Sequence, residues 1–508
     1  ANRPLIGPIY TAYCNRCFKN GAMDFDDLLL KFYQLLKTHP ESLSKYQRKF
    51  KYIMIDEYQD TNTSQYQIIK LLGAMHENVA VVGDDAQSIY SFRGATIENI
   101  LQFQKDYEEV KVVMLEQNYR SSQNILHVAN QVIANNKGQI PKKLWTSNNE
   151  GEKINLVRTA TDNDEGKYVA DMIQEQKLRN HYRNNDFAIL YRTNAQSRSY
   201  EESLRRMNIA YRIYGGISFY QRKEIKDFLS YLRVIVNPND EEALKRIINY
   251  PARGIGKTSI EKAILFANQH NISFWNVLER AAEFGYRATT LEVIKSFVIM
   301  IKMFQSELQK KNAYDLAILV GKQTAIVKEL FNDKTTEGLA RYENLQELLN
   351  SIKEFTETPT EDGELLDKSL GSYLQQITLL TDADDDKGAS DVVKLMTIHA
   401  AKGLEFPVVF VGGLEETLFP NAMAINTREE LEEERRLFYV AITRAKNRLW
   451  LTYANTRYRF GNLTQNDPSR FVDELPAEHV DKSFAGGNMR NNQTNHWNAF
   501  DRPKSPAY

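Results

Sequence analysis

Residues 51–60, KYIMIDEYQD, decide the fold class. A short apolar run stops at two acids, Asp56 and Glu57. Short apolar runs that end in polar residues are typical of buried strands in a parallel sheet, where the chemistry lies at the carboxyl ends of the strands. The runs NVAVVGDD (78–85) and VKVVMLEQ (110–117) repeat this pattern. The sequence therefore predicts an α/β unit that contains three strands in this region.

A second set of apolar runs predicts another α/β unit. These runs are KINLVR (153–158), FAILYRTN (187–194), VVKLMTIH (392–399), PVVFVGGL (407–414) and RLWLTYA (448–454). Between them, residues 220–386 have helical periodicity and end in the acidic linker TDADDDKGAS (381–390). This arrangement predicts an all-helical insertion within the second unit. From residue 476 onward the composition of Asn, Gly, Ser and Pro predicts a disordered tail.

Overall charge says little about the partners of this chain. Its 508 residues contain 65 Lys plus Arg against 66 Asp plus Glu, so a nucleic-acid surface would have to be a local basic patch. No apolar run is long enough to cross a membrane, and the first twenty residues lack the pattern of a signal peptide. We therefore expect a cytoplasmic protein without a membrane partner.

The two cysteines, Cys14 and Cys17, lie on an apolar helical stripe with Tyr10, Tyr13 and Phe18. A zinc site needs about four ligands, and a redox pair needs a strand-to-helix context. Neither is evident around residues 14–17. The interpretation we favour is that both cysteines pack in a core as small apolar residues.

The segment PARGIGKTS (251–259) ends like a phosphate-binding loop, but it does not fit one. That loop needs a glycine five residues before Gly256, and Pro251 stands there instead. The residues before it, EEALKRIINY (241–250), are helical rather than strand-like in pattern. The segment VGKQT (320–324) does not fit either.

Two strand-end loops carry residues suited to phosphate chemistry. A carboxylate such as Asp56 can hold Mg²⁺, and its neighbour Glu57 can orient an attacking water. Gln87 offers an amide that can sense a phosphate oxygen. Beyond it, Tyr90, Phe92 and Arg93 combine aromatic rings with a cation, on which single-stranded nucleic acid stacks. The alternative for these last residues is a packed aromatic helix start.

Taken together, six segments in order resemble the motif series of the UvrD/PcrA/Rep family of DNA helicases. They are IDEYQDTN (55–62), VVGDDAQSIYSFRGA (81–95), LEQNYRS (115–121), YGGISFYQRKEIKD (214–227), MTIHAAKGLEFPVVFVGG (396–413) and EERRLFYVAITRAKNRLWL (433–451). The resemblance covers roughly residues 5–475. It implies an ATP-dependent helicase that moves 3′ to 5′ along DNA.

The resemblance also implies a domain plan. The fold class is α/β, with two RecA-like parallel-sheet domains, the first incomplete, and an all-helical domain inserted in the second. The expected parts are the tail of an accessory helical domain (1–24), the first RecA-like domain (25–119), the second one (120–219 and 387–475), the helical accessory domain (220–386) and the tail (476–508).

For the nucleotide, the resemblance implies a site shared by both RecA-like domains. Asp56 would coordinate Mg²⁺, Glu57 would be the base for the hydrolytic water, and Gln87 would read the γ-phosphate of ATP. Tyr119, at the end of the first domain, would stack on adenine, and the second domain would contribute Glu405 on the ribose and Arg120 and Arg444 as arginine fingers.

For DNA, the resemblance implies a single-strand track and a separate duplex contact. Tyr90, Phe92 and Arg93 would contact the strand; Phe92 stands where the family commonly has tryptophan. The second domain would add Arg192, Asn194 and His399, although His399 equally suits a structural role. In the helical domain, Gly254, Gly256, Lys257 and Thr258 match a helix-hairpin-helix turn that binds duplex phosphates, with a plain turn as the alternative.

One departure from the family pattern is large. Its phosphate loop has no counterpart in these residues and would precede Ala1, so the sequence predicts the carboxy-terminal two thirds of a helicase. The expected partners are single-stranded DNA and single-strand/duplex junctions, with repair or replication proteins as candidates, and a monomer in solution. Two alternatives stay open: a non-catalytic nucleic-acid-binding module, and a subunit of a helicase-nuclease.

Overall fold

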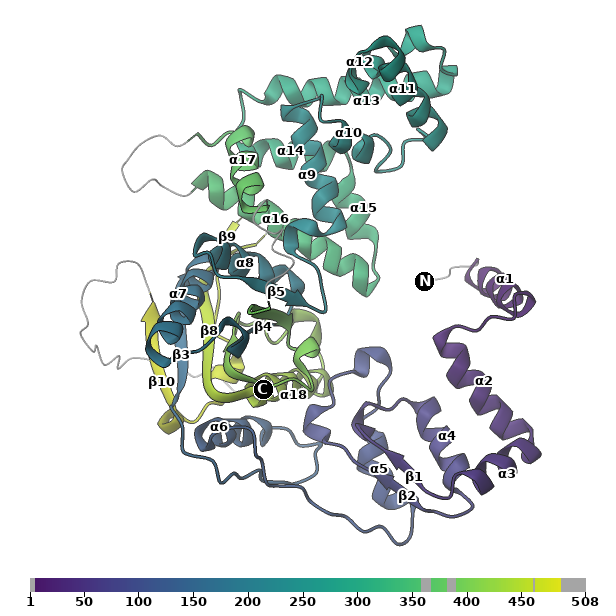
Figure 1. The fold of residues 1–508 in the computed structure, drawn as a ribbon, viewed down its shortest axis with the longest axis vertical. Coiled ribbons are helices and arrows are strands. Elements are labelled where there is room, and N and C mark those ends of the chain that lie inside the picture. The colour runs from purple at the N-terminus through teal and green to yellow at the C-terminus, as the bar shows by residue number, and fades with distance from the viewer. Residues whose placement is uncertain (1–4, 358–366, 382–389, 460–461, 486–508) are drawn as a thin grey trace.

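The computed structural model describes residues 5–357, 367–381, 390–459 and 462–485 (Figure 1). Three helices at the start of the chain lead into a small α/β body, followed by a larger α/β body from which a helical body projects. The predicted fold class, α/β with parallel sheets, is confirmed. Between strands β5 and β6, the described residues form helices only.

The first helices are α1 (Ile6–Lys19), α2 (Phe25–Thr38) and α3 (Pro40–Lys49). Residues 10–18 are helical as predicted, but their packing in a core is wrong. No residue of α1 is buried; Tyr10, Tyr13 and Phe18 are exposed, and Cys14 and Cys17 are only partly covered. Periodicity predicted the apolar face of α1 correctly, but it cannot say whether another element covers that face.

The first α/β body has a two-stranded parallel sheet of β1 (Ile53–Ile55) and β2 (Val79–Val81). Helices α4 (Thr63–Gly73) and α5 (Glu98–Asp106) accompany it. Its small core contains Tyr58, Ile69 and Ile100. The 3-10 turns η1 (Tyr58–Asp60), η2 (Asp85–Gln87) and η3 (Ser91–Arg93) follow the strand ends; η2 and η3 carry Gln87, Phe92 and Arg93, and the other predicted site residues of this body lie just before η1 and η3.

The third strand predicted in this body, at 110–117, is wrong. The segment forms no strand in the structure, and Val113 and Leu115 are 67% and 77% exposed. A cavity of about 940 Å³ is lined by both β2 and residues 109–116. A β-branched run becomes a strand only when a neighbouring strand pairs along it, and among the described residues this run pairs only at its end, where Gln117 forms an isolated parallel bridge with Trp145.

The second α/β body is built on an eight-stranded sheet. Seven strands follow the order β10-β3-β8-β7-β4-β6-β5, and the eighth, β9, pairs with β8. All pairs are parallel except β8 with β9. The strands are β3 (Ile154–Thr161), β4 (Phe187–Tyr191), β5 (Tyr211–Tyr214), β6 (Val393–Thr397), β7 (Phe406–Val411), β8 (Ala445–Arg459), β9 (Asn462–Gln465) and β10 (Val480–Ala485).

Alternation along β4 shows how helices cover this sheet. Successive side chains of a strand point to opposite faces. Ala188 and Leu190 pack in a core with α6 (Gln123–Ile133) and α18 (Arg428–Thr443). Phe187, Ile189 and Tyr191 pack in another core with α7 (Asp162–Asn180) and α8 (Ser197–Arg206). Both faces are covered, which explains why FAILY is apolar at every position.

The helical body has a core of its own, which spans its helices. The helices are α9 (Lys223–Val236), α10 (Glu241–Ile247), α11 (Lys257–His270), α12 (Phe274–Glu279), α13 (Ala288–Glu307), α14 (Ala313–Gln323), α15 (Ile326–Asn332), α16 (Thr336–Glu357) and α17 (Leu370–Thr381). Most of the acidic linker predicted at 381–390 lies outside the described residues.

A buried arginine joins the helical body to the second α/β body. Arg198 on α8 has an almost fully buried side chain and forms ion pairs with Glu347 (2.6 Å) and Glu354 (3.8 Å) of α16, and with Asp162 (3.6 Å) of α7. Removing one partner of a buried ion pair leaves an uncompensated charge, so this cluster fixes the base of the helical body.

At the other end of the chain, the disordered tail predicted from residue 476 is wrong for residues 476–485. Here η12 (Ala477–His479) leads into β10, which extends the sheet by pairing with β3 from Val480↔Ile154 to Ala485↔Thr159. Parallel pairing to an edge strand supplied order that the composition did not indicate. Residues 486–508 lie outside the described residues. Among those described, no helix has the length and apolar character needed to span a membrane.

Candidate functional site

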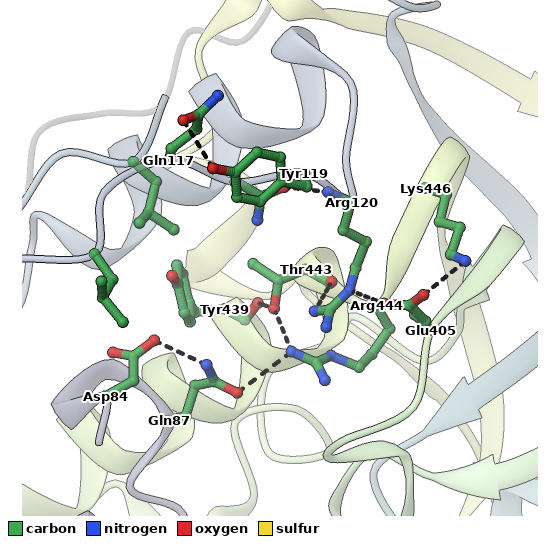
Figure 2. Close-up of a pocket in the computed structure, with 13 residues that line it drawn as sticks. Asp84, Gln87, Gln117, Tyr119, Arg120, Glu405, Tyr439, Thr443, Arg444 and Lys446 are labelled. Atoms are coloured by element: carbon green, nitrogen blue, oxygen red, sulfur yellow. Dashed lines mark hydrogen bonds and ion pairs between the residues drawn. The ribbon is translucent and has the colours of Figure 1, made fainter. Parts of the chain in front are cut away.

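A cavity of about 470 Å³ lies between the two α/β bodies, and we call it the interdomain cleft (Figure 2). The first body contributes Asp84 and Gln87. The other residues that line the cavity come from the segment leading into the second body and from the second body itself: Leu115, Gln117, Asn118, Tyr119, Arg120, Leu144, Glu405, Tyr439, Thr443, Arg444 and Lys446. Tyr119, Arg120, Glu405 and Arg444, all predicted to bind nucleotide, therefore share one cavity with Gln87.

Asp56 and Glu57 follow β1 but line the neighbouring 940 Å³ cavity, which also contains Asp84 and Gln87. Glu57 adopts a left-handed backbone conformation (φ 51°), which is rare for a residue with a side chain and is found at functional sites. Its carboxylate is 62% exposed and accepts a hydrogen bond from Gln59 Nε2 at 2.6 Å. The first body thus presents both acids beside the residue predicted to read the γ-phosphate.

The donor set at this strand end suits magnesium. Mg²⁺ prefers oxygen ligands, keeps several waters and is usually held by one or two carboxylates together with substrate phosphates. Asp56 and Glu57 both line the cavity and are exposed, and the Asp56 carboxylate accepts the Glu57 amide at 2.9 Å. Carboxylate oxygens are therefore available where Mg²⁺ would have to bind.

Gln87 and Arg444 meet across the interdomain cleft. Gln87 Nε2 donates to Asp84 at 2.8 Å, and its Oε1 accepts from Arg444 at 3.3 Å (Figure 2). Burial, together with the nearby charge of Arg120, lowers the pKa of Arg444 to about 10. The guanidinium is still charged at neutral pH, and its remaining bonds are to backbone oxygens and Thr443.

Arg120 and Glu405 form a charged group on the second-body side of the interdomain cleft. Arg120 Nε donates to Glu405 at 2.5 Å, and Lys446 lies 2.7 Å from the other oxygen of that carboxylate. The hydrogen bonds from Lys446 and Arg120 hold the pKa of Glu405 at about 2. Tyr119 is largely exposed on the same wall, and its hydroxyl donates to Gln117 at 2.9 Å. Glu405 is therefore ionised and already paired.

Tyr90, Phe92, Arg93 and His399 form one cluster, which we call the aromatic platform. The rings of Tyr90 and Phe92 lie 6.0 Å apart, and the His399 ring is 5.4 Å from Phe92. The Arg93 guanidinium lies 5.5 Å from each of the first two rings. Phe92 is 60% exposed, whereas Tyr90 is half-buried. The structure thus joins three residues of the first body to one of the second.

His399 is neutral at physiological pH. Burial, and then the charges of Arg192 and Arg93, lower its pKa to about 3. Its backbone oxygen accepts the Tyr90 hydroxyl at 3.1 Å. A neutral ring beside exposed Phe92 is compatible with base stacking, and it is equally compatible with the structural alternative raised by the sequence.

Arg192 and Asn194 lie on the second body but differ in availability. Arg192 makes a two-pronged ion pair with Glu434, with Nη2 at 2.7 Å and Nε at 3.0 Å from Oε1. Asn194 is exposed at the start of a 3-10 turn, and its backbone oxygen accepts from Arg222. To contact a phosphate, Arg192 would have to share or leave Glu434, whereas the Asn194 side chain is accessible.

The Gly-Ile-Gly turn lies apart from these residues, between α10 and α11, in the part of the helical body farthest from the large sheet (Figure 1). Asn249 Oδ1 accepts the amides of Arg253 and Ile255, both at 3.0 Å, which shapes the turn. The left-handed backbone at residue 254 (φ 86°) favours glycine, because a side chain there would be strained. No atom stands within 4 Å of where a Cβ would be at Gly254 or Gly256, so the backbone is open to a ligand.

The residues after this turn begin α11 without a side-chain cap at Gly256. Lys257 is 90% exposed, with Glu261 at 3.7 Å, and Thr258 is also exposed. Uncapped amides at a helix start favour anions. The predicted residues are thus together and accessible, although the plain-turn alternative predicts the same local geometry.

Sequence reasoning missed several residues that hold the site together. Lys446 pairs with Glu405, Gln59 holds Glu57, and Lys402 bridges the two α/β bodies. Lys446 lies at the start of β8, just after the helix end that carries Arg444, where no repeating pattern indicates which face a side chain takes. Gln59 and Lys402 lie in irregular turns, where spacing carries no such signal.

Comparison with known proteins identifies the family. Residues 1–108 match the UvrD/REP helicase N-terminal domain, and residues 113–456 match the UvrD-like helicase C-terminal domain. Among curated relatives, the ATP-dependent DNA helicase PcrA of Staphylococcus epidermidis is 44% identical over 483 residues, covering 94% of this chain and 65% of that protein. The PcrA of Staphylococcus aureus is 43% identical over 485 residues, covering 95% and 66%.

The chain therefore spans about two thirds of the length of these relatives. The matched ranges cover both α/β bodies and the helical body that is inserted in the second. They contain the positions of Asp56 and Glu57, the cleft arginines and the aromatic platform. The chain belongs to the UvrD-like helicase family.

Proposed function

We propose that this chain forms most of an ATP-dependent DNA helicase motor that moves 3′ to 5′ along a single strand. One observation carries the proposal. Gln87 from one α/β body faces Arg120 and Arg444 across the interdomain cleft, Asp56 and Glu57 line the neighbouring cavity that Gln87 also lines, and the aromatic platform spans the same two bodies. Phosphate chemistry and strand contact would then respond to one relative movement.

In this proposal Glu57 takes a proton from the water that attacks the γ-phosphate of ATP. Asp56 would hold Mg²⁺, which neutralises charge on the phosphates when it is bound. Gln87 would contact the γ-phosphate, and Arg120 and Arg444 would stabilise the charge that develops during transfer. The Gln87 to Arg444 contact of 3.3 Å supports a site that closes between the bodies.

Binding the triphosphate also requires a phosphate-binding loop, which these 508 residues do not contain beside Asp56. We propose that a segment ahead of Ala1 supplies it, as in the family pattern, beside the 940 Å³ cavity that Asp56 and Glu57 line. The ATP-binding and turnover experiments therefore use an extended chain, in which the amino-terminal segment of the Staphylococcus aureus relative is joined ahead of Ala1.

The aromatic platform would hold the single strand. Phe92 exposes a ring face, and Arg93 places a cation beside it, a combination that stacks bases without sequence preference. Asn194 and His399 would add contacts from the second body. Opening and closing of the cleft would change the spacing of these contacts and so move the strand.

The Gly-Ile-Gly turn would bind the duplex ahead of the strand. Its open backbone, the uncapped start of α11 and the exposed Lys257 support a phosphate contact. Because it lies on the helical body, this contact would act on single-strand/duplex junctions rather than on single strands.

The role of Glu57 predicts a separation of binding from hydrolysis. In the extended chain, Glu57→Gln should retain Mg²⁺-ATP binding but lose turnover by about 10²-fold or more, because a carboxamide cannot accept the proton. Phosphate release and nucleotide binding measure the two steps. Glu98→Gln, at an exposed acid of the same body, is the control. Turnover of Glu57→Gln near that of the parent would refute the role.

The aromatic platform predicts a loss of single-strand affinity. Phe92→Ala, and likewise Tyr90→Ala, should cost about 1–3 kcal/mol in binding of labelled oligo-dT, measured by fluorescence anisotropy on the 508-residue chain. Phe331→Ala, at a phenylalanine of similar exposure in the helical body, should leave binding unchanged. Equal affinities for Phe92→Ala and Phe331→Ala would remove Phe92 from the DNA track.

The Gly-Ile-Gly turn predicts a selective loss at junctions. Lys257→Glu should weaken binding to a single-strand/duplex junction and lower the salt dependence of that binding by about one ion, while oligo-dT binding stays the same. Lys295→Glu makes the same charge change elsewhere on the helical body and serves as the control. If Lys257→Glu binds junctions normally, the turn is structural only.

A further inference from the structure

Lys402 connects the two α/β bodies at the strand-end acids. It follows the 3-10 turn η9 (His399–Ala401) of the second body, and its side chain is only 9% exposed. Its Nζ donates to Asp60 Oδ2 at 2.5 Å and to the backbone oxygen of Gln87 at 2.8 Å, and it lies 3.6 Å from Glu57 Oε2. All three oxygens belong to the first body.

The same turn touches the aromatic platform. His399, three residues before Lys402, accepts the Tyr90 hydroxyl through its backbone oxygen, and its ring packs on Phe92. Lys402 Nζ itself lies 5.1 Å from the centre of the Tyr90 ring. A nucleobase that stacks on the aromatic platform would therefore contact the η9 turn, which begins at His399 and is followed by Lys402.

Two donors set the position of the Glu57 carboxylate, and they differ in mobility. Gln59 is fully buried, donates to Glu57 Oε2, and accepts the Asp84 amide at 3.0 Å, so it is fixed within the first body. Lys402 approaches the same oxygen from the second body. Movement between the bodies would change the Lys402 contact while leaving the Gln59 contact in place.

Asp60 shows how much this corner depends on the lysine. Among the described residues, its buried Oδ1 has no hydrogen-bond partner, so Lys402 is the partner that compensates the carboxylate. A buried carboxylate without its cation is costly. A shift of Lys402 would therefore change the distance from its ammonium group to the carboxylates of both Asp60 and Glu57.

We propose that Lys402 is a positioning residue that couples DNA contact at the aromatic platform to the placement of Glu57. The inference rests on the proposed helicase function. In this proposal, a DNA strand bound at Tyr90, Phe92 and His399 fixes the position of the η9 turn. Lys402, which follows that turn, then fixes the position of the Glu57 carboxylate. The competing explanation is a static ion pair that only joins the two bodies.

The test compares ATP turnover with and without DNA in the extended chain. Lys402→Met should reduce stimulation by saturating oligo-dT to below about twofold, with the KM for ATP within about threefold of the parent. Lys402→Arg keeps the cation and should restore at least half of the stimulation. Asp60→Asn, which preserves side-chain volume, should also lose stimulation. Anisotropy confirms saturation for each variant, so weaker DNA binding does not imitate the effect.

Lys394→Met is the matched control, since Lys394 is a partly buried lysine of β6 in the same body, and its stimulation should match the parent. Full stimulation in Lys402→Met would overturn the proposal in favour of a static pair. Loss of all turnover in both Lys402→Met and Lys402→Arg would also overturn it, because the lysine would then be needed for hydrolysis itself. Absence of stimulation in the parent would instead contradict the proposed function.

Discussion

The contacts that the buried Arg436 and Arg444 of the second α/β body make with the first constrain how the two bodies meet. Arg436 and Arg444 are almost fully buried, and they donate to the backbone oxygen of Ser88 and to the side chain of Gln87. A guanidinium cannot lose its charge at neutral pH, so leaving it buried without acceptors would be costly. These contacts bring the strand-end loops of the first body against α18, and the interdomain cleft exists because of them.

The same constraint explains how nucleotide and strand sites come to be adjacent. The loop after β2 contributes Gln87 to the cleft and, a few residues later, Tyr90 and Phe92 to the aromatic platform. In the second body, one segment between β6 and β7 carries His399, Lys402 and Glu405. Each body therefore links the two proposed sites through a single short loop, which is the basis for the proposed coupling between them.

Much of this was predictable because parallel strands that are buried on both faces have a distinctive sequence. FAILY and PVVFV were recognised as strands, and polar residues at the strand ends indicated the site. What failed depended on partners far along the chain. The run at 110–117 has no strand beside it, the apolar face of α1 is uncovered, and β10 is ordered by pairing with β3. Gln59 lies in a 3-10 turn whose spacing gives no signal, and Lys402 was missed because its role depends on which turn of the first body lies beside it.

The central claim is that the cleft is one ATP site built from both α/β bodies. Turnover of the extended chain at saturating ATP and oligo-dT, compared between the parent and Arg444→Lys, tests it most directly. The lysine keeps a buried cation but loses the fork that reaches Gln87, so the account predicts a fall of about 10³-fold. Turnover within about tenfold of the parent would show that the second body does not complete the site, and it would contradict the account.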